Sequence, residues 1–474
     1  MDKQNEKTKS STSRVPDTLF LYISVITAHL VSIASGTSMV WTSPVLGKLY
    51  SNDTEVNPIG RPITTIEVSM LAAIPTFTNI PGILFMPKLS DIIGRKRYLL
   101  SAAFVMLLAG VGLAFSNNVA LMIITRCIFG FHGSWMVVCL YVAEVTEDHN
   151  RGKFGCYFGI LHQIGHLFGF VIGPFFSVKY FTLITISPLL IFLVIFTMLP
   201  ETPMYLLAKG REEECKMALR KLRSNKTEEE IEVDLEKLKE NLKKQKEEKG
   251  KITDLTKKRE SRLAVILGLL PLITTYCSGV TVIFTFLAPF FDEAGTSLSG
   301  DIVAIIIVVF KITFFLLTSL VIERFGRRKM FLISSTSTAI PLFLLGIYFY
   351  LQSIDSSLIA YLQWLPLTCL IFTVCFFGLG LGPIAQAFVA ELPSEELRAV
   401  TSSLVHSIGI FVSFALTFLY PIISELGVQW CVWWFSMNCV VGSILMYFFL
   451  PETKGKSFVE IQDMLKNYSK LRKQ

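Results

Sequence analysis

The sequence predicts an all-α membrane protein with twelve transmembrane helices in two six-helix halves. Of its 474 residues 52% are hydrophobic and 38 are Phe, and the mean hydropathy is +0.55. A soluble chain of this length is far less apolar. The charged residues fall in separate blocks between long apolar runs, and landmarks of the first half recur in the same order in the second. That recurrence indicates an internal duplication of the membrane domain.

Twelve apolar stretches approach the roughly 20 residues that an α-helix needs to cross about 30 Å of hydrocarbon. They cover residues 20–46, 67–87, 98–117, 119–143, 154–178, 180–199, 263–290, 301–322, 330–351, 360–389, 400–425 and 428–450. Six lie on each side of a highly charged segment. The chain therefore divides into an N-terminal segment 1–18, a half 19–200, a linker 201–262, a half 263–450 and a tail 451–474.

The basic residues predict the orientation of these spans. If both termini are inside, only Lys48, Arg61 and Lys179 of the loop residues fall outside. Cytoplasmic loops are enriched in Lys and Arg, so we expect a multi-pass protein, of the plasma membrane, with both termini in the cytoplasm. The net charge of +7 then reflects topology and attraction to anionic lipid, rather than nucleic-acid binding. Asn52, in the sequon 52–54, falls outside and is a candidate for glycosylation.

The linker changes to dense mixed charge. Ile231, Leu235, Leu238 and Leu242 recur at helical spacing between Glu and Lys, which predicts amphipathic helices beneath the membrane domain. A solvated linker of partial helicity is the alternative.

The nine cysteines show no CxxC pairing, and eight of them fall inside apolar runs. We expect buried thiols, without a disulfide framework or a metal site. The sequence also lacks a Walker A loop, an HExxH helix and a nucleophile elbow, so neither an enzyme nor a cofactor is expected.

Three charged landmarks carry the duplication. Each half has an acid followed by a Gly-Arg cluster, an acid seven residues before an arginine, and a Pro-Glu-Thr motif that closes the half. In the first half these are the cluster 91–97, Glu144 with Arg151, and the motif 200–203. In the second half they are the cluster 323–329, Glu391 with Arg398, and the motif 451–454.

These landmarks, together with Arg126, Gly130 and Gly382-Pro383, resemble the sugar porter family of the major facilitator superfamily. The resemblance covers both halves, and the stretch 41–44 (Trp-Thr-Ser-Pro) is similar to insect facilitated trehalose and hexose transporters. It implies the major facilitator fold and alternating access around a midplane cavity. The expected solute is a small polar molecule, a sugar (trehalose or hexose) or a polyol. The chain departs from the family at Pro87, His132 and Met204.

The resemblance also implies that ion pairs at the cytoplasmic ends of the helices form a gate between helices and between halves. Partial desolvation there strengthens a pair beyond the roughly 0–1 kcal/mol of an exposed one. The alternative treats the same residues as topology signals and partners of helix dipoles. The candidate gate residues are Asp91, Arg95, Glu144, Arg151, Glu323, Arg327, Arg328, Glu391 and Arg398.

Most positions at which the family binds sugar are changed in this chain. The family's Gln-Gln pair in the seventh span, aligned on Ser278-Gly279, is Thr275-Tyr276 in this chain, and the Asn that follows is Thr281. The positions of the family's Asn in the eighth span, Trp in the tenth and two Asn in the eleventh are occupied by Lys311, Gln386, Gly409 and Ser413. Since unmatched buried polar groups cost free energy, hexose specificity does not transfer. The candidate substrate-binding residues are Gln163, Thr275, Tyr276, Thr281, Lys311 and Gln386.

Two charged residues lie within the predicted spans. A lysine near mid-span costs roughly 2.5–3.5 kcal/mol on insertion scales, so we expect Lys311 to face a water-filled cavity; snorkelling to the interface is the alternative. Arg126 matches a position that proton-coupled members pair with an Asp of the first helix. Residues 20–47 contain no acid, which favours facilitated diffusion. Arg126 as a structural donor to backbone carbonyls remains open.

Two other functions are compatible with the sequence. One is a transporter-like sensor that binds a nutrient without moving it. The other is a facilitator of organic anions attracted to Lys311 and Arg126.

Overall fold

The computed structural model describes residues 17–132, 135–247, 259–296, 298–456 and 458–468. The side chains of residues 245–247, 318–324, 395 and 458–459 lie outside the description. The described residues form helices, turns and loops, with no strand among them. Twelve described segments are long and apolar enough to cross a membrane, one at each predicted stretch. The predicted fold class is confirmed.

The first half comprises six spans, and the first of them is divided into two helices at Trp41. They are α1 (Leu19–Val40) with α2 (Thr42–Leu49), α3 (Thr65–Ile93), α4 (Arg95–Ala114), α5 (Val119–Phe131) with α6 (Trp135–Val145), α7 (Arg151–Ile172) with a 3₁₀ turn (Gly173–Phe175), and α8 (Val178–Phe196).

The second half also has six spans. Its first span is divided into three helices and its fourth into two. It comprises α13 (Arg259–Cys277) with α14 (Val280–Thr285) and α15 (Leu287–Asp292), α16 (Gly300–Phe325), α17 (Arg327–Ser353), α18 (Leu365–Phe376) with α19 (Gly382–Glu391), α20 (Arg398–Ser424) and α21 (Val428–Phe449). Gly279 separates α13 from α14 with a left-handed backbone (φ 73°), which glycine adopts without steric cost. A π-helical turn, Phe377–Leu381, joins α18 to α19.

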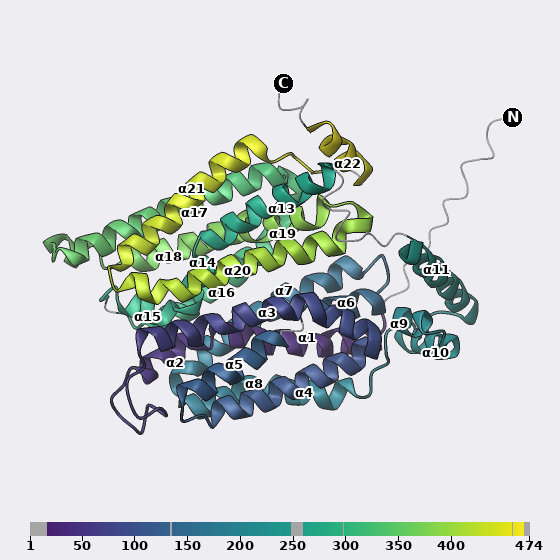
Figure 1. Cartoon of the computed structure of the whole chain (residues 1–474), viewed down its shortest axis with the longest axis horizontal. Coiled ribbons are helices and arrows are strands. Elements are labelled where there is room, and N and C mark those ends of the chain that lie inside the picture. The colour runs from purple at the N-terminus through teal and green to yellow at the C-terminus, as the bar shows by residue number, and fades with distance from the viewer. Residues whose placement is uncertain (1–16, 133–134, 248–258, 297, 457, 469–474) are drawn as a thin grey trace.

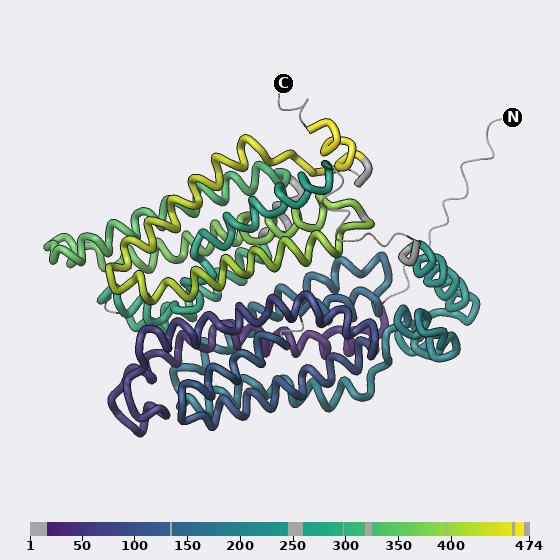
Figure 2. The backbone as a smooth tube through the Cα atoms, in the orientation of Figure 1, coloured from purple at the N-terminus to yellow at the C-terminus, as the bar shows by residue number. Residues whose placement is uncertain are grey.

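The two halves pack side by side along their helices (Figures 1 and 2), with α3 against α20 and α7 against α16. The Phe77 and Phe414 rings meet across the first of these contacts at 4.9 Å. One end of the bundle, here called the linker side, carries the linker helices and α22 (Phe458–Lys466). The opposite end, here called the loop side, carries the loop 50–64.

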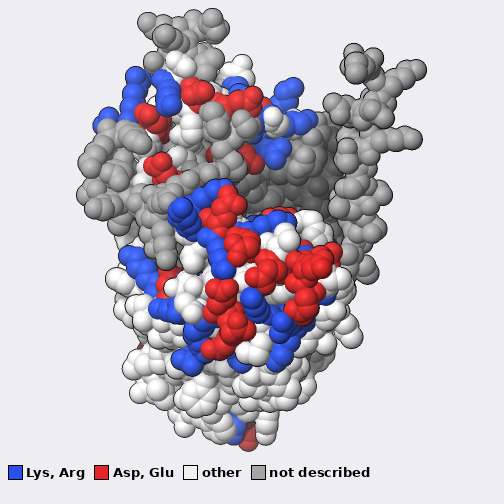
Figure 3. All heavy atoms as spheres, turned by 90° about the vertical axis from the view of Figure 1, so that its right-hand side faces the viewer, with Lys and Arg blue, Asp and Glu red and all other residues white. Residues whose placement is uncertain are grey.

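The linker forms helices α9 (Pro203–Ala208), α10 (Glu212–Leu222) and α11 (Glu228–Glu247). Ile231 and Leu235 of α11 are buried against Cys215 and Leu219 of α10. The expected amphipathic helices are therefore present, because each helix buries its apolar face against the others. The charged faces stay exposed, and Figure 3 shows Lys, Arg, Asp and Glu gathered on the linker side above a mostly uncharged flank.

The cysteines differ from the expectation in part. Six of the nine are buried, Cys127 and Cys139 are partly exposed, and Cys156 is exposed. Cys156 lies on the first turns of α7, near the linker side. Its place in an apolar stretch of sequence therefore did not predict burial of its side chain.

Candidate substrate site and gate

A buried ion-pair network closes the linker end of the first half. Arg95, the first residue of α4, lies with Nη2 2.6 Å from the Asp91 carboxylate and 3.0 Å from Oε1 of Glu144. The other oxygen of Glu144 accepts a hydrogen bond of 2.5 Å from the Thr202 hydroxyl. The side chains of Arg95 and Glu144 are each 10% exposed. Such desolvated pairs are costly to break, because removing one partner leaves a buried charge.

The second half repeats this arrangement with its own residues. Arg327, the first residue of α17, places Nε 3.4 Å from Oε1 of Glu391. Thr453 donates 2.6 Å to the other Glu391 oxygen. An arginine at a helix start, an acid and a threonine of the Pro-Glu-Thr motif thus meet in each half, so the duplication seen in the sequence is a duplication of contacts.

The glutamate of each Pro-Glu-Thr motif caps the same two helices. Glu201 accepts a 2.9 Å hydrogen bond from the Lys96 backbone N–H, and Glu452 accepts one of 3.0 Å from that of Arg327. A carboxylate at a helix N-terminus satisfies free N–H groups and complements the helix dipole. The glycines before the two helices, Gly94 (φ 105°) and Gly326 (φ 87°), have no Cβ to obstruct these carboxylates.

The remaining gate candidates have other partners. Arg151 pairs with Asp148 at 3.0 Å and donates to the Ala143 carbonyl, rather than to Glu144. The turn between α6 and α7 separates Arg151 from the Glu144 carboxylate. Arg328 donates to the Tyr447 carbonyl.

Arg398 is the first residue of α20, and the Glu323 side chain lies outside the described residues. The Arg95–Glu144 and Arg327–Glu391 pairs each join residues of one half. The expected network between the halves stays a prediction.

Polar contacts between the halves are instead found on the loop side. The Ser43 hydroxyl of α2 accepts a 2.8 Å hydrogen bond from the Ala288 N–H of α15. Thr65, at the start of α3, donates 2.5 Å to Glu425 at the end of α20. These two contacts join the halves on the loop side, while the Arg95–Glu144 and Arg327–Glu391 pairs each stay within one half.

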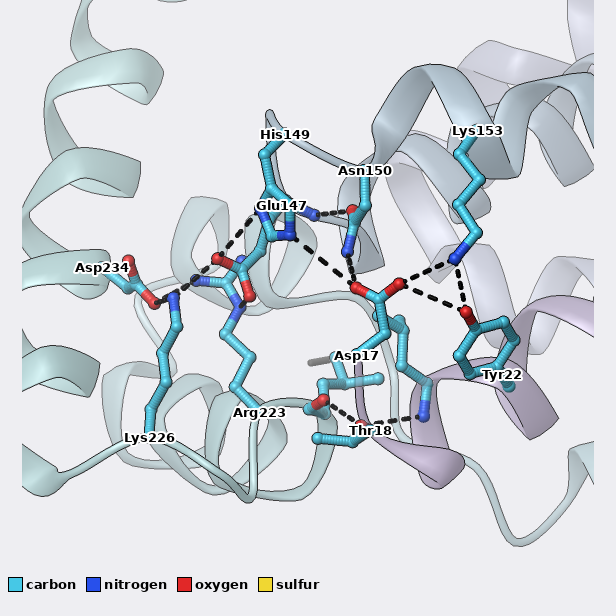
Figure 4. A network of polar contacts seen from close by, with 12 residues as sticks. Asp17, Thr18, Tyr22, Glu147, His149, Asn150, Lys153, Arg223, Lys226 and Asp234 are labelled. Carbon is cyan, nitrogen blue, oxygen red and sulfur yellow. Dashed lines mark hydrogen bonds and ion pairs between the residues drawn. The ribbon is translucent and has the colours of Figure 1, made fainter. Parts of the chain in front are cut away.

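A second network ties the linker helices to the first half (Figure 4). Arg223 lies 2.5 Å from Asp234, and Lys226 bridges Asp234 at 2.8 Å and Glu147 at 2.6 Å. Burial raises the pKa of Asp234, but the hydrogen bonds and charges of Lys226 and Arg223 outweigh it, and the pKa lies below its usual value. The pairing fixes α10 and α11 to the turn that precedes α7.

The same turn is tied to the start of α1. Asp17 accepts 2.7 Å from the Asn150 amide and 3.0 Å from Lys153. Burial raises the pKa of Asp17, but these hydrogen bonds dominate and lower it. Thr18 caps α1 and donates 2.7 Å to the Leu222 carbonyl at the end of α10. The first half and the linker therefore form one connected unit.

Lys311 is buried between the halves at the middle of its helix. It lies eleven residues after the start of α16 and fourteen before its end, roughly 16 and 21 Å along the axis at 1.5 Å per residue. Its ammonium lies 3.7 Å from the centre of the Phe284 ring and 3.4 Å from Nδ1 of His166. Snorkelling does not apply, because the side chain is 8% exposed and ends in this cluster.

Gln386 lies in a separate contact between the halves. Its Oε1 lies 2.6 Å from Nε2 of His406, and Nδ1 of this histidine lies 2.8 Å from the Ser402 carbonyl oxygen. The His406 ring lies 5.9 Å from that of Trp135 on α6. Phe158 continues the ring contacts from Trp135 at 5.8 Å. Aromatic and imidazole rings therefore connect Gln386 to the first half.

Among the remaining substrate candidates, Gln163 has a buried amide oxygen without a hydrogen-bond partner among the described residues. Thr275 donates 2.8 Å to the Pro271 carbonyl and 2.7 Å to the Leu381 carbonyl, so its hydroxyl joins α13 to the π turn. Tyr276 packs against Gly409, where an added Cβ would lie 2.7 Å from Cε2 of the tyrosine. Thr281 is partly exposed at the start of α14.

Arg126 is surrounded by neutral oxygens. It donates 2.6 Å to the Ser38 carbonyl, 3.2 Å to the Ser38 hydroxyl, 3.1 Å to the Thr42 hydroxyl and 3.4 Å to the Leu71 carbonyl. Its guanidinium also lies 5.2 Å from the centre of the Trp41 ring. Arg126 thus donates to carbonyl and hydroxyl oxygens, as in the alternative that makes it a structural donor. These oxygens occupy the place where an acid would form an ion pair with the guanidinium.

Sequence reasoning missed the partners of Lys311. His166 and His162 lie one turn apart on α7, with ring centres 4.9 Å apart, and Phe284 lies on α14. The i, i+4 spacing of the two histidines places them on one face of a helix. Nothing in the sequence indicated that this face meets α16.

Comparison with known proteins matches the whole chain. The family model described as "Sugar (and other) transporter" matches residues 8–465. The facilitated trehalose transporter Tret1 of Culex quinquefasciatus is 27% identical over 454 residues, covering 93% of this chain and 84% of that protein. The Aedes aegypti Tret1 is also 27% identical, over 461 residues, and the chain spans 55% of its length.

Solved structures share the fold. The inward open conformation of the xylose transporter XylE from E. coli has a TM-score of 0.77 at 20% identity, covering 94% of this chain and 99% of that one. XylE bound to 6-bromo-6-deoxy-D-glucose, described as a proton:xylose symporter of the major facilitator superfamily, has a TM-score of 0.69 at 21% identity.

Proposed function

The chain belongs to the sugar (and other) transporter family, and on this premise we propose that it moves a solute of the sugar or polyol class across a membrane by alternating access. Transport proceeds by facilitated diffusion, without covalent chemistry. The solute binds between the halves near the midplane, and the halves rock about it. Its similarity to a trehalose transporter and to the xylose transporter XylE supports a hydroxylated solute.

The duplicated linker-side network is the observation that carries this proposal. Alternating access needs two halves that move as units and a set of contacts that can form in one state and break in the other. Arg95 with Glu144 and Arg327 with Glu391 hold corresponding helix ends in the two halves. Each half is thereby fixed internally, and motion is left to the boundary between the halves.

The surroundings of Arg126 support facilitated diffusion. Proton coupling requires a group that gains and loses a proton during transport. Arg126 instead donates to oxygens of Ser38, Thr42 and Leu71, which are hydroxyl and carbonyl groups that do not titrate near neutral pH. No acid lies in α1 or α2. The solute gradient alone then drives transport.

We assign the gate to Asp91, Arg95, Glu144, Arg327 and Glu391, with Arg151, Glu323, Arg328 and Arg398 beside them. We place Lys311, Gln163, Gln386, Tyr276 and Thr281 near the solute. Thr275 affects the site indirectly, because its hydroxyl holds the π turn through the Leu381 carbonyl. We keep the five ranges set out from the sequence, with two six-helix halves separated by the linker, as the domains of the transporter.

The linker side is assigned to the cytoplasm and the loop side to the exterior of the plasma membrane. The Lys and Arg of the linker and of the interhelical turns on that side support this orientation. Asn52 is exposed in the loop 50–64 and is accessible to glycosylation there.

Flux into proteoliposomes tests the proposal. Purified protein is reconstituted and offered labelled trehalose, glucose, xylose, sorbitol and glucuronate, with empty liposomes as the control. Saturable uptake that equilibrates without a proton gradient is the expected result. Specific binding without flux would identify a sensor, and the absence of flux for every solute would refute the transport proposal.

A further inference from the structure

We propose that Lys311 and His166 form an anion subsite at the midplane, and that the transported solute places a carboxylate there. The inference rests on the proposed function, since it assigns a substrate class, sugar acids, to the same site.

The first argument is the balance of charge within the spans. Every Asp and Glu of the twelve described spans lies within two residues of a span end. Among the described Lys and Arg that lie farther in, Lys88 and Arg262 are within five residues of an end, and Arg126 and Lys311 lie deeper, in the interior. A charge at this depth costs several kcal/mol unless something compensates it. The described interior therefore holds two cations and no protein anion.

The two cations differ in how they are compensated. Arg126 has four oxygen contacts and the Trp41 ring face, which account for its guanidinium. Lys311 has only the Phe284 ring face and one imidazole nitrogen. A ring face attracts the charged ammonium, but it accepts no conventional hydrogen bond. An ammonium at this position therefore has donor capacity that these two contacts do not use.

The polarity of the contact with His166 adds a second donor. An ammonium can only donate, so Nδ1 of His166 is the acceptor and the imidazole proton lies on Nε2. That nitrogen is buried and has no hydrogen-bond partner among the described residues. Two adjacent groups thus offer donors without acceptors. A carboxylate has two oxygens that accept from both and also supplies the missing negative charge.

The rest of the solute is indicated by Gln163. Its buried amide oxygen is an acceptor without a donor, and Gln163 lies three residues before His166 on α7, so the two side chains emerge from neighbouring positions. A hydroxyl group is a suitable donor for this oxygen. Donors for a carboxylate beside an acceptor for a hydroxyl match a hydroxylated acid, as sugar acids are.

The test compares glucuronate with glucose, which differ by the carboxylate at C6. Binding to the purified wild-type protein is measured as the ligand concentration that gives half of the thermal stabilisation, at constant ionic strength. Acetate and chloride are tested as small anions. Lys311→Asn removes the charge, and Lys179→Asn, at an exposed position outside the cluster, removes one positive charge elsewhere.

We expect glucuronate to bind the wild type and Lys179→Asn at least about tenfold more tightly than glucose, the scale of one hydrogen bond to a charged group. Lys311→Asn should lose this preference, because the cation that contacts the carboxylate is gone. Equal binding of both ligands to the wild type, or an unchanged preference in Lys311→Asn, would overturn the inference. The wild-type comparison decides even if the variant does not fold.

Two further outcomes separate the possibilities. Stabilisation by acetate or chloride that depends on Lys311, without further gain from glucuronate, would assign the subsite to a resident counterion and overturn the substrate class. Flux of neutral sugars with no response to glucuronate would leave the transport proposal standing and overturn this inference alone.

Discussion

The variant Gly94→Ala tests whether the helix cap by Glu201 holds the first half together. Gly94 has φ 105° and ψ 148°, a conformation open almost only to glycine. A Cβ there would collide with the Glu201 carboxylate and lie 3.2 Å from Cε1 of Tyr205. The carboxylate cannot withdraw freely, because it accepts from the backbone N–H groups of Lys96 and Thr202.

Two costs add in this variant. A non-glycine residue in such a conformation costs about 1–3 kcal/mol. Displacing the carboxylate weakens at least one hydrogen bond to a charged group, which is worth about 1.5–3 kcal/mol. We therefore expect a loss of about 3 kcal/mol or more. For a unit the size of one half, this lowers the melting temperature on the order of 5–10 °C.

The assay is thermal unfolding of the purified protein in detergent, followed by tryptophan fluorescence. Gly155→Ala is the matched control, because Gly155 lies in α7 with open space around a new Cβ. Alanine in a helix is favoured over glycine by about 0.5–1 kcal/mol, so this control should melt at or above the wild-type temperature. A melting temperature of Gly94→Ala within 1 °C or so of the control would refute the capping argument.

Three further outcomes follow from the same contacts. Glu391→Gln weakens the second-half gate and should raise the alkylation rate of Cys156, the exposed cysteine of α7; an unchanged rate would count against the gate. Downhill uptake should persist when a protonophore collapses the proton gradient, because neutral oxygens surround Arg126; uptake that falls with the gradient would contradict uniport. Asp234, whose folded pKa is depressed, stabilises the linker fully above its unfolded pKa near 3.9. The protection factors of the α11 amides, which are the exchange rates corrected for the intrinsic pH dependence of exchange, should therefore be constant from pH 8 to 5 and fall only below about pH 4. Asp234→Asn should lower them at pH 7, and equal protection in the variant would refute the role of the pair with Arg223.

The span positions could be predicted from sequence because crossing a bilayer is a property of each stretch alone. A run of about 20 apolar residues must be helical in lipid, since an unpaired backbone group there is too costly. The breaks within spans were not predicted. The π turn 377–381 is held by partners from elsewhere: the Leu381 N–H donates 2.7 Å to Ser334 of α17, and its carbonyl accepts from Thr275 of α13. Hydropathy contains no information on such contacts.

The gate residues were identified by residue type, but their pairing was predicted only in part. Sequence spacing suggested Glu144 with Arg151, seven residues apart, whereas the partner of Glu144 is Arg95, from a helix 49 residues earlier. The duplicated motif pointed to Arg95, Glu144, Arg327 and Glu391, which form one ion pair in each half. It could not distinguish a partner on the next turn of the chain from one on a neighbouring helix.

The substrate positions show why a residue-by-residue comparison cannot specify a site. Read separately, Tyr276 and Gly409 are two losses of amides that the resemblance leads one to expect. In the structure they are one compensated change, because the tyrosine ring occupies the space that a side chain at Gly409 would fill. At this contact, packing stands where the resemblance leads one to expect hydrogen-bonding side chains. Polar recognition is then left to the side of the site where Lys311, His166 and Gln163 keep unmatched hydrogen-bonding capacity. A search for the solute should therefore vary the charge of the test compounds before it varies the size of their rings.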